Sequence, residues 1–263
     1  MTTVAFEISN RVCHLRLSRP EKLNALNEAV REELHAHLST LTDRPDVSVL
    51  VVSGEGRAFS AGADLATMPA TPAASWAQRR HEAGGWQRLL ELLEAVPQVT
   101  VASIQGYCIG GAALLGVACD LRIAAADVHV QIPELDIGIP LTWSGVPRLA
   151  REVGLPMARD LVMTGRTLNG EAALACGFVQ RLVAVGELAA ATDSLVAQLL
   201  AMSEAPLAMT RSMFSAISRD QSGAAGWADA DLLAWSLAEG ESREAAANYR
   251  RKRLAQGGGS SPG

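Results

Sequence analysis

One carboxylate stands in a strongly apolar segment of this chain. Residues 129–143 read HVQIPELDIGIPLTW, and Glu134 lies there among valine, isoleucine and leucine residues. Burying a carboxylate in such surroundings costs several kcal/mol unless the group is paired, protonated or used in chemistry, and general base catalysis is one such use. Taken alone, the segment favours the simpler interpretation of a surface turn in which Glu134 and Asp136 face water.

Two glycine-rich turns are the other candidates for chemistry. RAFSAGADL spans residues 57–65 and GYCIGGAALLGVACDL spans residues 106–121, each following a strand pattern. Neither contains the GxxxxGK or GxGxxG spacing of nucleotide-binding loops. Small residues at the junction of a strand and a helix free backbone N–H groups to point into a cavity. Each turn alone indicates only a tight bend, whereas two such turns side by side can form an oxyanion hole.

The elements that must position these residues alternate between strand and helix patterns. We predict a hairpin over residues 4–17, a helix over 26–41 and a buried strand over 47–54. One continuous helix is predicted over 76–96, followed by a second buried strand over 99–106.

After residue 147 helical patterns dominate, so the sequence indicates an α/β fold with a helical C-terminal region. We expect an α/β core over residues 1–200, a helical region over 201–255 and a disordered Gly/Ser-rich tail over 256–263.

The composition excludes several classes of protein. The net charge of −5 argues against nucleic acid as a general partner, because phosphate binding needs a broad basic surface. The four cysteines and five histidines lack metal-ligand spacing, so no metal site is expected, and reduced thiols fit a cytoplasmic protein. Residues 96–119 carry no charge, but their four glycines indicate a buried strand and helix rather than membrane insertion. Only 19% of residues are charged, which predicts a homo-oligomer.

The second glycine-rich turn carries a family resemblance. VASIQGYCIGGAALLGVACDL, residues 101–121, resembles the signature of the enoyl-CoA hydratase/isomerase family, also called the crotonase superfamily. Three further stretches agree with the family in order and spacing: RPEKLNALN (19–27), RAFSAGADL (57–65) and PELDIGIP (133–140). VMTGRTLNGEAALACGFVQRLV (162–183) also resembles the family. The resemblance covers roughly residues 4–255 and implies a crotonase-like spiral of ββα units. It also implies C-terminal helices that assemble homotrimers, often paired as hexamers.

The resemblance implies an active site that acts on an acyl-CoA thioester and needs no metal or further cofactor. The backbone N–H groups of Ala63 and Gly111 would polarise the thioester carbonyl, and Glu134 matches the second of the two glutamates of the family hydratases. The first glutamate would fall at position 114, where this chain has Leu114. With a single carboxylate base, the chain resembles the Δ3–Δ2-enoyl-CoA isomerases of fatty-acid metabolism. Trp143 either forms a wall of the acyl pocket and helps to exclude water, or packs in the core.

The family pattern also suggests contacts with the CoA part of the substrate. The backbone near Ala25 and the turn containing Asp64 and Leu65 would bind the CoA arm, with Lys22 on a phosphate. The basic stretch YRRKR at 249–253 is either a helix end that interacts favourably with the helix dipole, which is the preferred interpretation, or a clamp on the CoA phosphates.

Two alternatives to an isomerase stay open from the sequence. One is an enoyl-CoA hydratase that uses Glu134 alone, and the other is a non-catalytic acyl-CoA-binding protein that kept the pocket after losing a catalytic acid. For Asp136 a structural or solvent-facing role is favoured, because it lies two residues from Glu134 and in a turn need not share its face.

Overall fold

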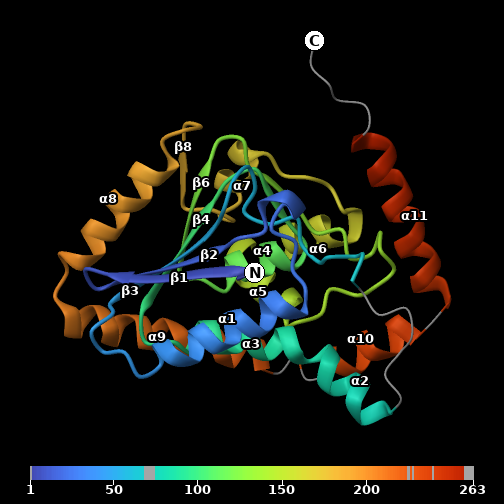
Figure 1. Cartoon of the computed structure of the whole chain (residues 1–263), viewed down its shortest axis with the longest axis horizontal. Coiled ribbons are helices and arrows are strands. Elements are labelled where there is room, and N and C mark those ends of the chain that lie inside the picture. The colour runs from blue at the N-terminus through green and yellow to red at the C-terminus, as the bar shows by residue number, and fades with distance from the viewer. Residues whose placement is uncertain (1, 68–74, 224–225, 227, 239, 258–263) are drawn as a thin grey trace.

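The chain folds into a mixed α/β structure, seen in a computed structural model that describes residues 2–67, 75–223, 226, 228–238 and 240–257 (Figure 1). The strands are β1 (Val4–Ser9), β2 (Val12–Leu17), β3 (Val49–Gly54), β4 (Val99–Ile104), β5 (Tyr107–Ile109), β6 (Leu121–Ala125), β7 (His129–Gln131) and β8 (Arg181–Val183). The helices are α1 (Glu28–Leu41), α2 (Trp76–Ala83), α3 (Gly85–Ala95), α4 (Gly111–Val117), α5 (Gly145–Val153), α6 (Leu155–Thr164), α7 (Gly170–Ala175), α8 (Leu188–Leu200), α9 (Glu204–Gly223), α10 (Asp229–Ala238) and α11 (Gly240–Gly257), with a 3-10 turn at Pro20–Lys22.

A twisted sheet forms the centre of the described structure, with the strand order β1-β2-β3-β4-β6-β8. The predicted hairpin is confirmed, because β1 and β2 pair antiparallel around a turn at Asn10 and Arg11. Both turn residues have positive φ values of 49° and 67°, as in the tight hairpin turns that match strand twist. The remaining neighbours in this sheet pair in parallel.

A second layer of parallel pairing runs beside the main sheet and explains the spiral. β5 pairs with β7, and isolated bridges join Leu26 to Ala63 and Ser60 to Cys108. Each ββα unit therefore contributes one long strand to the main sheet and one short segment to the second layer, and is followed by a helix. The unit β4–β5–α4 is an example. The fold is the expected spiral of ββα units followed by C-terminal helices.

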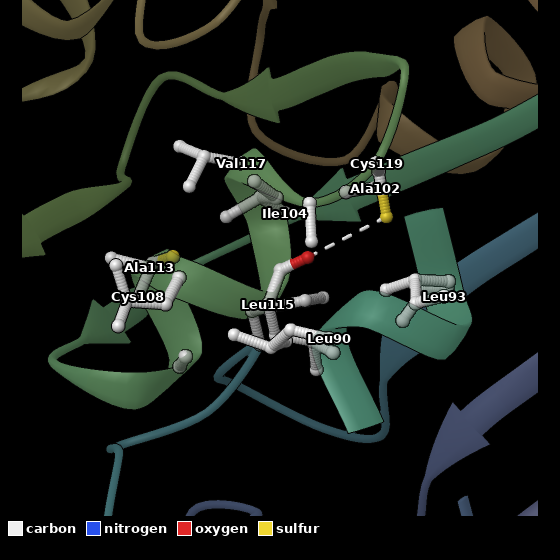
Figure 2. Packing of buried hydrophobic residues seen from close by; sticks show 14 of the residues in the cluster. Leu90, Leu93, Ala102, Ile104, Cys108, Ala113, Leu115, Val117 and Cys119 are labelled. Atoms are coloured by element: carbon white, nitrogen blue, oxygen red, sulfur yellow. Dashed lines mark hydrogen bonds between the residues drawn. The ribbon is translucent and has the colours of Figure 1, made fainter. Parts of the chain in front are cut away.

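Helices cover both faces of the main sheet. Leu195 and Val196 of α8 pack against one face, where Val49, Val51 and Val101 form a small apolar cluster. The larger core lies on the other face and includes the buried side chains of α1, α3 and α4. Figure 2 shows side chains of α3 and β4 around α4, where the Cys119 thiol donates a hydrogen bond to the Leu115 carbonyl (3.6 Å). This packing fixes α4, whose first residue is Gly111.

The predicted continuous helix over residues 76–96 is wrong, because the chain breaks into α2 and α3 at Gly84. Gly84 ends α2 and also caps the start of α3. The next residue, Gly85, packs against the Arg31 side chain of α1, whose Nε atom would lie 3.1 Å from an added Cβ. The break turns α2 away from the core and toward α10, which it contacts.

The C-terminal helices extend away from the sheet, and Figure 1 shows α11 on the side opposite α8. The helix α11 runs to Gly257, and residues 258–263 of the predicted tail lie outside the described residues. Within the basic stretch 249–253, Arg251 and Lys252 are exposed, while the side chains of Arg250 and Arg253 lie outside the described ones. No helix in the described ranges combines the length and apolar character needed to cross a membrane.

Candidate active site

The two glycine-rich turns lie against each other. Ser60 of the first turn pairs with Cys108 of β5, and the Ile109 N–H donates to the Ser60 carbonyl at 3.2 Å. Gly62 has a φ of +82°, a left-handed conformation that favours glycine. A Cβ atom at Gly62 would collide with the Ile109 carbonyl. This close approach places Ala63 beside the start of α4.

Hydrogen bonds from the segment before α1 hold the first turn in place. The Leu26 N–H donates to the Gly62 carbonyl and the Asp64 N–H donates to the Leu26 carbonyl, both at 2.8 Å. Asn24 is buried, and its side-chain amide donates to the Glu55 and Ala58 carbonyls at 2.9 and 2.8 Å. The residues before and after Ala63, Gly62 and Asp64, are therefore both held by hydrogen bonds to Leu26, which fixes the position of Ala63.

The N–H groups of Ala63 and Gly111 are both available to a ligand. Gly111 is the first residue of α4, so its N–H has no acceptor within the helix. Among the described residues, neither N–H donates a hydrogen bond to another protein group. Both residues line the same cavity. Two free backbone donors in the wall of one cavity are the groups that an oxyanion hole requires.

The carboxylate of Glu134 is buried next to these donors. The side chain is 8% exposed, and its Oε2 atom has no hydrogen-bond partner within the described structure. Its Oε1 atom would lie only 2.7 Å from a Cβ atom at Gly110, whose φ of +56° also favours glycine. Burial raises the pKa of Glu134 from 4.5 to about 7, while a hydrogen bond from its own backbone acts in the opposite direction. Glu134 is therefore suited to accept and return a proton near neutral pH.

An apolar cavity of about 540 Å³ connects these groups. Six of the eight predicted site residues line this cavity: Ala63, Asp64, Gly111, Leu114, Glu134 and Trp143. The other two, Ala25 and Leu65, neighbour lining residues but are not part of the wall. The Ala25 carbonyl accepts a hydrogen bond from Arg19 Nη1 at 2.6 Å. Lys22 is exposed on the 3-10 turn and also lies outside the wall.

Comparison with known proteins agrees with the fold. The sequence model of the family described as enoyl-CoA hydratase/isomerase matches residues 7–258. The chain belongs to this enoyl-CoA hydratase/isomerase family. A probable enoyl-CoA hydratase of Mycobacterium bovis is 35% identical over 202 residues, which cover 76% of this chain and 77% of that protein.

Solved structures of enoyl-CoA hydratase/isomerase proteins show the same architecture. An enoyl-CoA hydratase/isomerase from Xanthobacter autotrophicus Py2 is 27% identical, with a TM-score of 0.86 over 97% of this chain and 95% of that one. A putative enoyl-CoA hydratase from Thermobifida fusca YX, solved in complex with CoA, is 28% identical, with a TM-score of 0.76 over the same two shares.

The cavity of this hydratase/isomerase family member contains other acids, but each has a polar partner. Asp64 forms a 3.0 Å ion pair with Arg19, and Glu28 pairs with Arg31. Glu82 accepts a 3.0 Å hydrogen bond from the Gln78 side chain. Among the acids of the described wall, Glu134 alone is buried with an unpaired carboxylate oxygen.

Asp136 does not share this environment. It is exposed, and its carboxylate lies near Gly165, where an added Cβ would be 2.9 Å from Oδ2. The solvent-facing position favoured from the sequence is therefore confirmed.

Several residues of the wall carry no signal in the sequence that marks them as site residues. Trp86 of α3 stacks on Trp143, with ring centroids 5.1 Å apart. Leu233, Ala234 and Leu237 of α10 close the cavity from the C-terminal region. Their apolar spacing is that of any packed helix, so only the docked position of α10 reveals their role. A helix expected only for assembly thus also contributes to the site.

Proposed function

We propose that this protein is an acyl-CoA enzyme of fatty-acid metabolism that acts as a Δ3–Δ2-enoyl-CoA isomerase. The observation that carries the proposal is a single buried, unpaired carboxylate, Glu134, in a cavity where Leu114 occupies the position that corresponds to the first glutamate of the family hydratases. An apolar side chain at that position leaves one proton-transfer group beside the oxyanion donors. One group is sufficient to move a double bond, whereas holding and activating water normally engages two.

In the proposed reaction, the thioester carbonyl of a 3-enoyl-CoA accepts hydrogen bonds from the N–H groups of Ala63 and Gly111. The ionised Glu134 carboxylate removes a proton from C2, and the C2–H electron pair forms the C1–C2 double bond of a dienolate. The negative charge then rests on the thioester oxygen, which the two donors stabilise by about 3 kcal/mol each. The protonated Glu134 returns the proton at C4, and the electrons shift to leave a double bond between C2 and C3. No redox equivalent or metal takes part in this sequence of steps.

The apolar walls support isomerisation over addition of water. Leu114 is 1% exposed and lies on α4, three residues after the donor Gly111. Trp143 and Trp86 add two stacked indoles to the same cavity. A water molecule held in a cavity needs at least two polar partners, and these side chains offer few.

A hydratase is the second candidate, because similar proteins carry that name. The Mycobacterium bovis relative is a probable enoyl-CoA hydratase. The Syntrophomonas wolfei relative, 27% identical over 96% of both chains, is a crotonyl-CoA hydratase. A CoA thioester as substrate is common to both candidates, and the Thermobifida fusca structure in complex with CoA supports it.

The decisive experiment offers the purified protein 3-enoyl-CoA and 2-enoyl-CoA thioesters in parallel and identifies the products by mass spectrometry and NMR. We expect conjugation of the 3-enoyl substrate, with loss of activity in Glu134→Gln. Formation of 3-hydroxyacyl-CoA alone would establish the hydratase. Binding of acyl-CoA without turnover would establish the non-catalytic alternative.

Leu114→Glu tests the role assigned to the missing acid. Under the proposal this variant gains hydration of 2-enoyl-CoA, because a second carboxylate then faces the cavity beside Glu134. Leu114→Met is the matched control, since it keeps the site apolar at similar volume. Equal hydration by the wild type, Leu114→Met and Leu114→Glu would show that position 114 does not select the reaction.

We also propose that the protein assembles as a homotrimer or hexamer. Support comes from α9, where Met209, Met213, Phe214 and Ile217 are between 56% and 69% exposed in the single chain. Contiguous apolar exposure of this kind is typical of protein–protein contacts. Light scattering coupled to size-exclusion chromatography measures the subunit number, and a monomer would contradict the proposal.

A further inference from the structure

The loop that carries Trp143 into the cavity has an unusual backbone. Trp143 and Ser144 have successive positive φ values of 60° and 51°. Residues other than glycine rarely adopt this left-handed backbone region, and a bulky residue such as tryptophan is disfavoured there. A conformation of this kind persists only when its surroundings hold it in place.

Two buried charged groups hold the loop from opposite sides. The Arg148 guanidinium donates through Nη1 to the Trp143 carbonyl. The Asp229 carboxylate of α10 accepts a hydrogen bond from the Ser144 N–H at 2.6 Å. Both backbone groups of the Trp143–Ser144 peptide are therefore bound by side chains of α5 and α10.

A third buried residue fixes the direction of Arg148. Arg148 is fully buried on α5, and its Nε and Nη2 atoms donate to the two carboxylate oxygens of Glu94 at 3.0 and 2.7 Å. A bidentate pair of this kind fixes the plane of the guanidinium as well as its position. Glu94 lies at the end of α3, the helix that also carries Trp86.

The held loop brings the Trp143 indole onto the oxyanion donor Gly111. An added Cβ at Gly111 would lie 2.7 Å from the Cη2 atom of Trp143. The indole also stacks on the ring of Trp86, at an interplanar angle of 16°. The indole can occupy this position only because residue 111 is glycine and because the loop is left-handed.

We infer that Arg148, Glu94 and Asp229 are positioning residues that hold the Trp143 indole against Gly111 and so keep water from the oxyanion donors. The inference rests on the proposed function, since water matters there because it competes for the two N–H groups and for the enolate. None of the three residues lies in the wall of the cavity. Their effect passes through the backbone of Trp143 and Ser144.

A second buried arginine provides a matched control. Arg122 of β6 is 1% exposed, forms an ion pair with Glu152, and donates to the Phe178 and Cys119 carbonyls. None of its hydrogen bonds in the described structure reaches Trp143, Ser144 or a residue of the cavity wall. Its partner Glu152 also pairs with Arg151, which reaches Glu94 at 3.4 Å, so Arg122 lies at the far end of the ion-pair network that includes Arg148. Arg122→Lys therefore disturbs a buried ion pair of the same network that does not itself contact the loop.

The experiment compares Arg148→Lys with Arg122→Lys in the full-length protein. Three quantities are measured: kcat and KM on the substrate that the wild type turns over, the melting temperature, and acrylamide quenching of Trp143 fluorescence. The Trp143 signal is taken as the difference from Trp143→Phe, because the chain contains five tryptophans.

We expect Arg148→Lys to lower kcat by about tenfold to a hundredfold, with a smaller change in KM, because the indole moves relative to the donor. Quenching of Trp143 should increase. Arg122→Lys should lower the melting temperature but leave kcat and quenching nearly unchanged. In the Trp143→Phe background, Arg148→Lys should have less effect on kcat than in the wild type, because the two changes act through one side chain.

The inference would be overturned if kcat fell in both arginine variants in proportion to the decrease in their melting temperatures. If Arg148→Lys does not fold, Glu94→Gln takes its place, because it keeps the Arg148 side chain and removes one of the two carboxylate oxygens that orient it. It also changes the 3.4 Å pair of Glu94 with Arg151, so its melting temperature is measured beside its kcat. The quenching result stands even where the wild type proves to be a hydratase. Failure of the proposed function and failure of this inference are therefore distinguishable.

Discussion

Glu134→Gln should remove activity and stabilise the fold at neutral and alkaline pH. Burial raises the pKa of Glu134 from 4.5 to about 7. Between these values the folded protein retains a proton that the unfolded chain has released, so the free energy of unfolding falls as the pH rises. The stabilising effect of the neutral carboxyl is therefore complete below pH 4.5 and is lost as the pH passes through about 7.

The size of this effect follows from the two pKa values. At about 1.4 kcal/mol for each tenfold change in proton affinity, the ionised carboxylate costs about 3 kcal/mol in full. About 2 kcal/mol of this develops between about pH 5.5 and about pH 8.5. Glutamine cannot ionise, and the cost of burying its amide does not vary with pH. The pH dependence of the difference between the two proteins therefore isolates the carboxylate.

The assay is urea unfolding of both proteins, followed by circular dichroism at fixed protein concentration over this pH range. Fixed concentration matters because any assembly contributes to the apparent stability. Asp136→Asn is the matched control, because it removes an exposed carboxylate two residues away. Parallel stability curves for wild type and Glu134→Gln across the pH range would refute the buried, unpaired carboxylate. Full activity of Glu134→Gln would refute its role as the base.

Further expectations concern the same site. Gly111→Ala should lower kcat/KM by about a hundredfold or more in the enzymatic assay, because its Cβ would meet Trp143 Cη2 at 2.7 Å. Its control is Gly116→Ala in the same helix, where the nearest contact is an ordinary 3.5 Å to Ile104; unchanged activity in both variants would contradict this packing. Asn24→Ala should destabilise the fold by about 1–3 kcal/mol in urea, since it leaves the Glu55 and Ala58 carbonyls without their donor; an unchanged midpoint would show that water replaces it. The kcat/KM of the wild type should rise with pH through about 7 as Glu134 ionises, and a flat profile would exclude an essential base in this range.

The sequence predicted correctly those helices and strands in which the buried apolar residues recur at one regular spacing. The helix α1 shows this, because Val30, Leu34, Leu38 and Leu41 are spaced on one face and all four are buried. The break at Gly84 escaped the same reasoning, since the apolar spacing of α3 resumes at once after the two glycines. At the break, the Arg31 side chain reaches Gly85 from α1. A contact between residues so far apart in the chain has no local signal.

Some residues of the candidate site were also predicted from the sequence, and others were not. The family resemblance predicted that Ala63, Gly111 and Glu134 lie at one site, and all three line the same cavity. The apolar segment taken alone favoured a surface turn with Glu134 facing water, and the burial of Glu134 shows that interpretation to be wrong. Arg148 was not predicted, because an arginine in an amphipathic helix normally faces water. Only the fold places its guanidinium between Glu94 and the Trp143 carbonyl.

The environment of Glu134 fits the demands of a one-base isomerase. Such a group must accept a proton from C2 and then release it at C4, so it works best when its pKa lies near the working pH. Burial raises the pKa to about 7 against the opposing effect of a hydrogen bond from the Glu134 backbone. A second carboxylate at position 114 would oppose ionisation further through like-charge repulsion and would also hold water. Leu114 keeps Glu134 buried and avoids both consequences. The absence of a carboxylate at position 114 therefore supports the proposed reaction as strongly as the presence of Glu134.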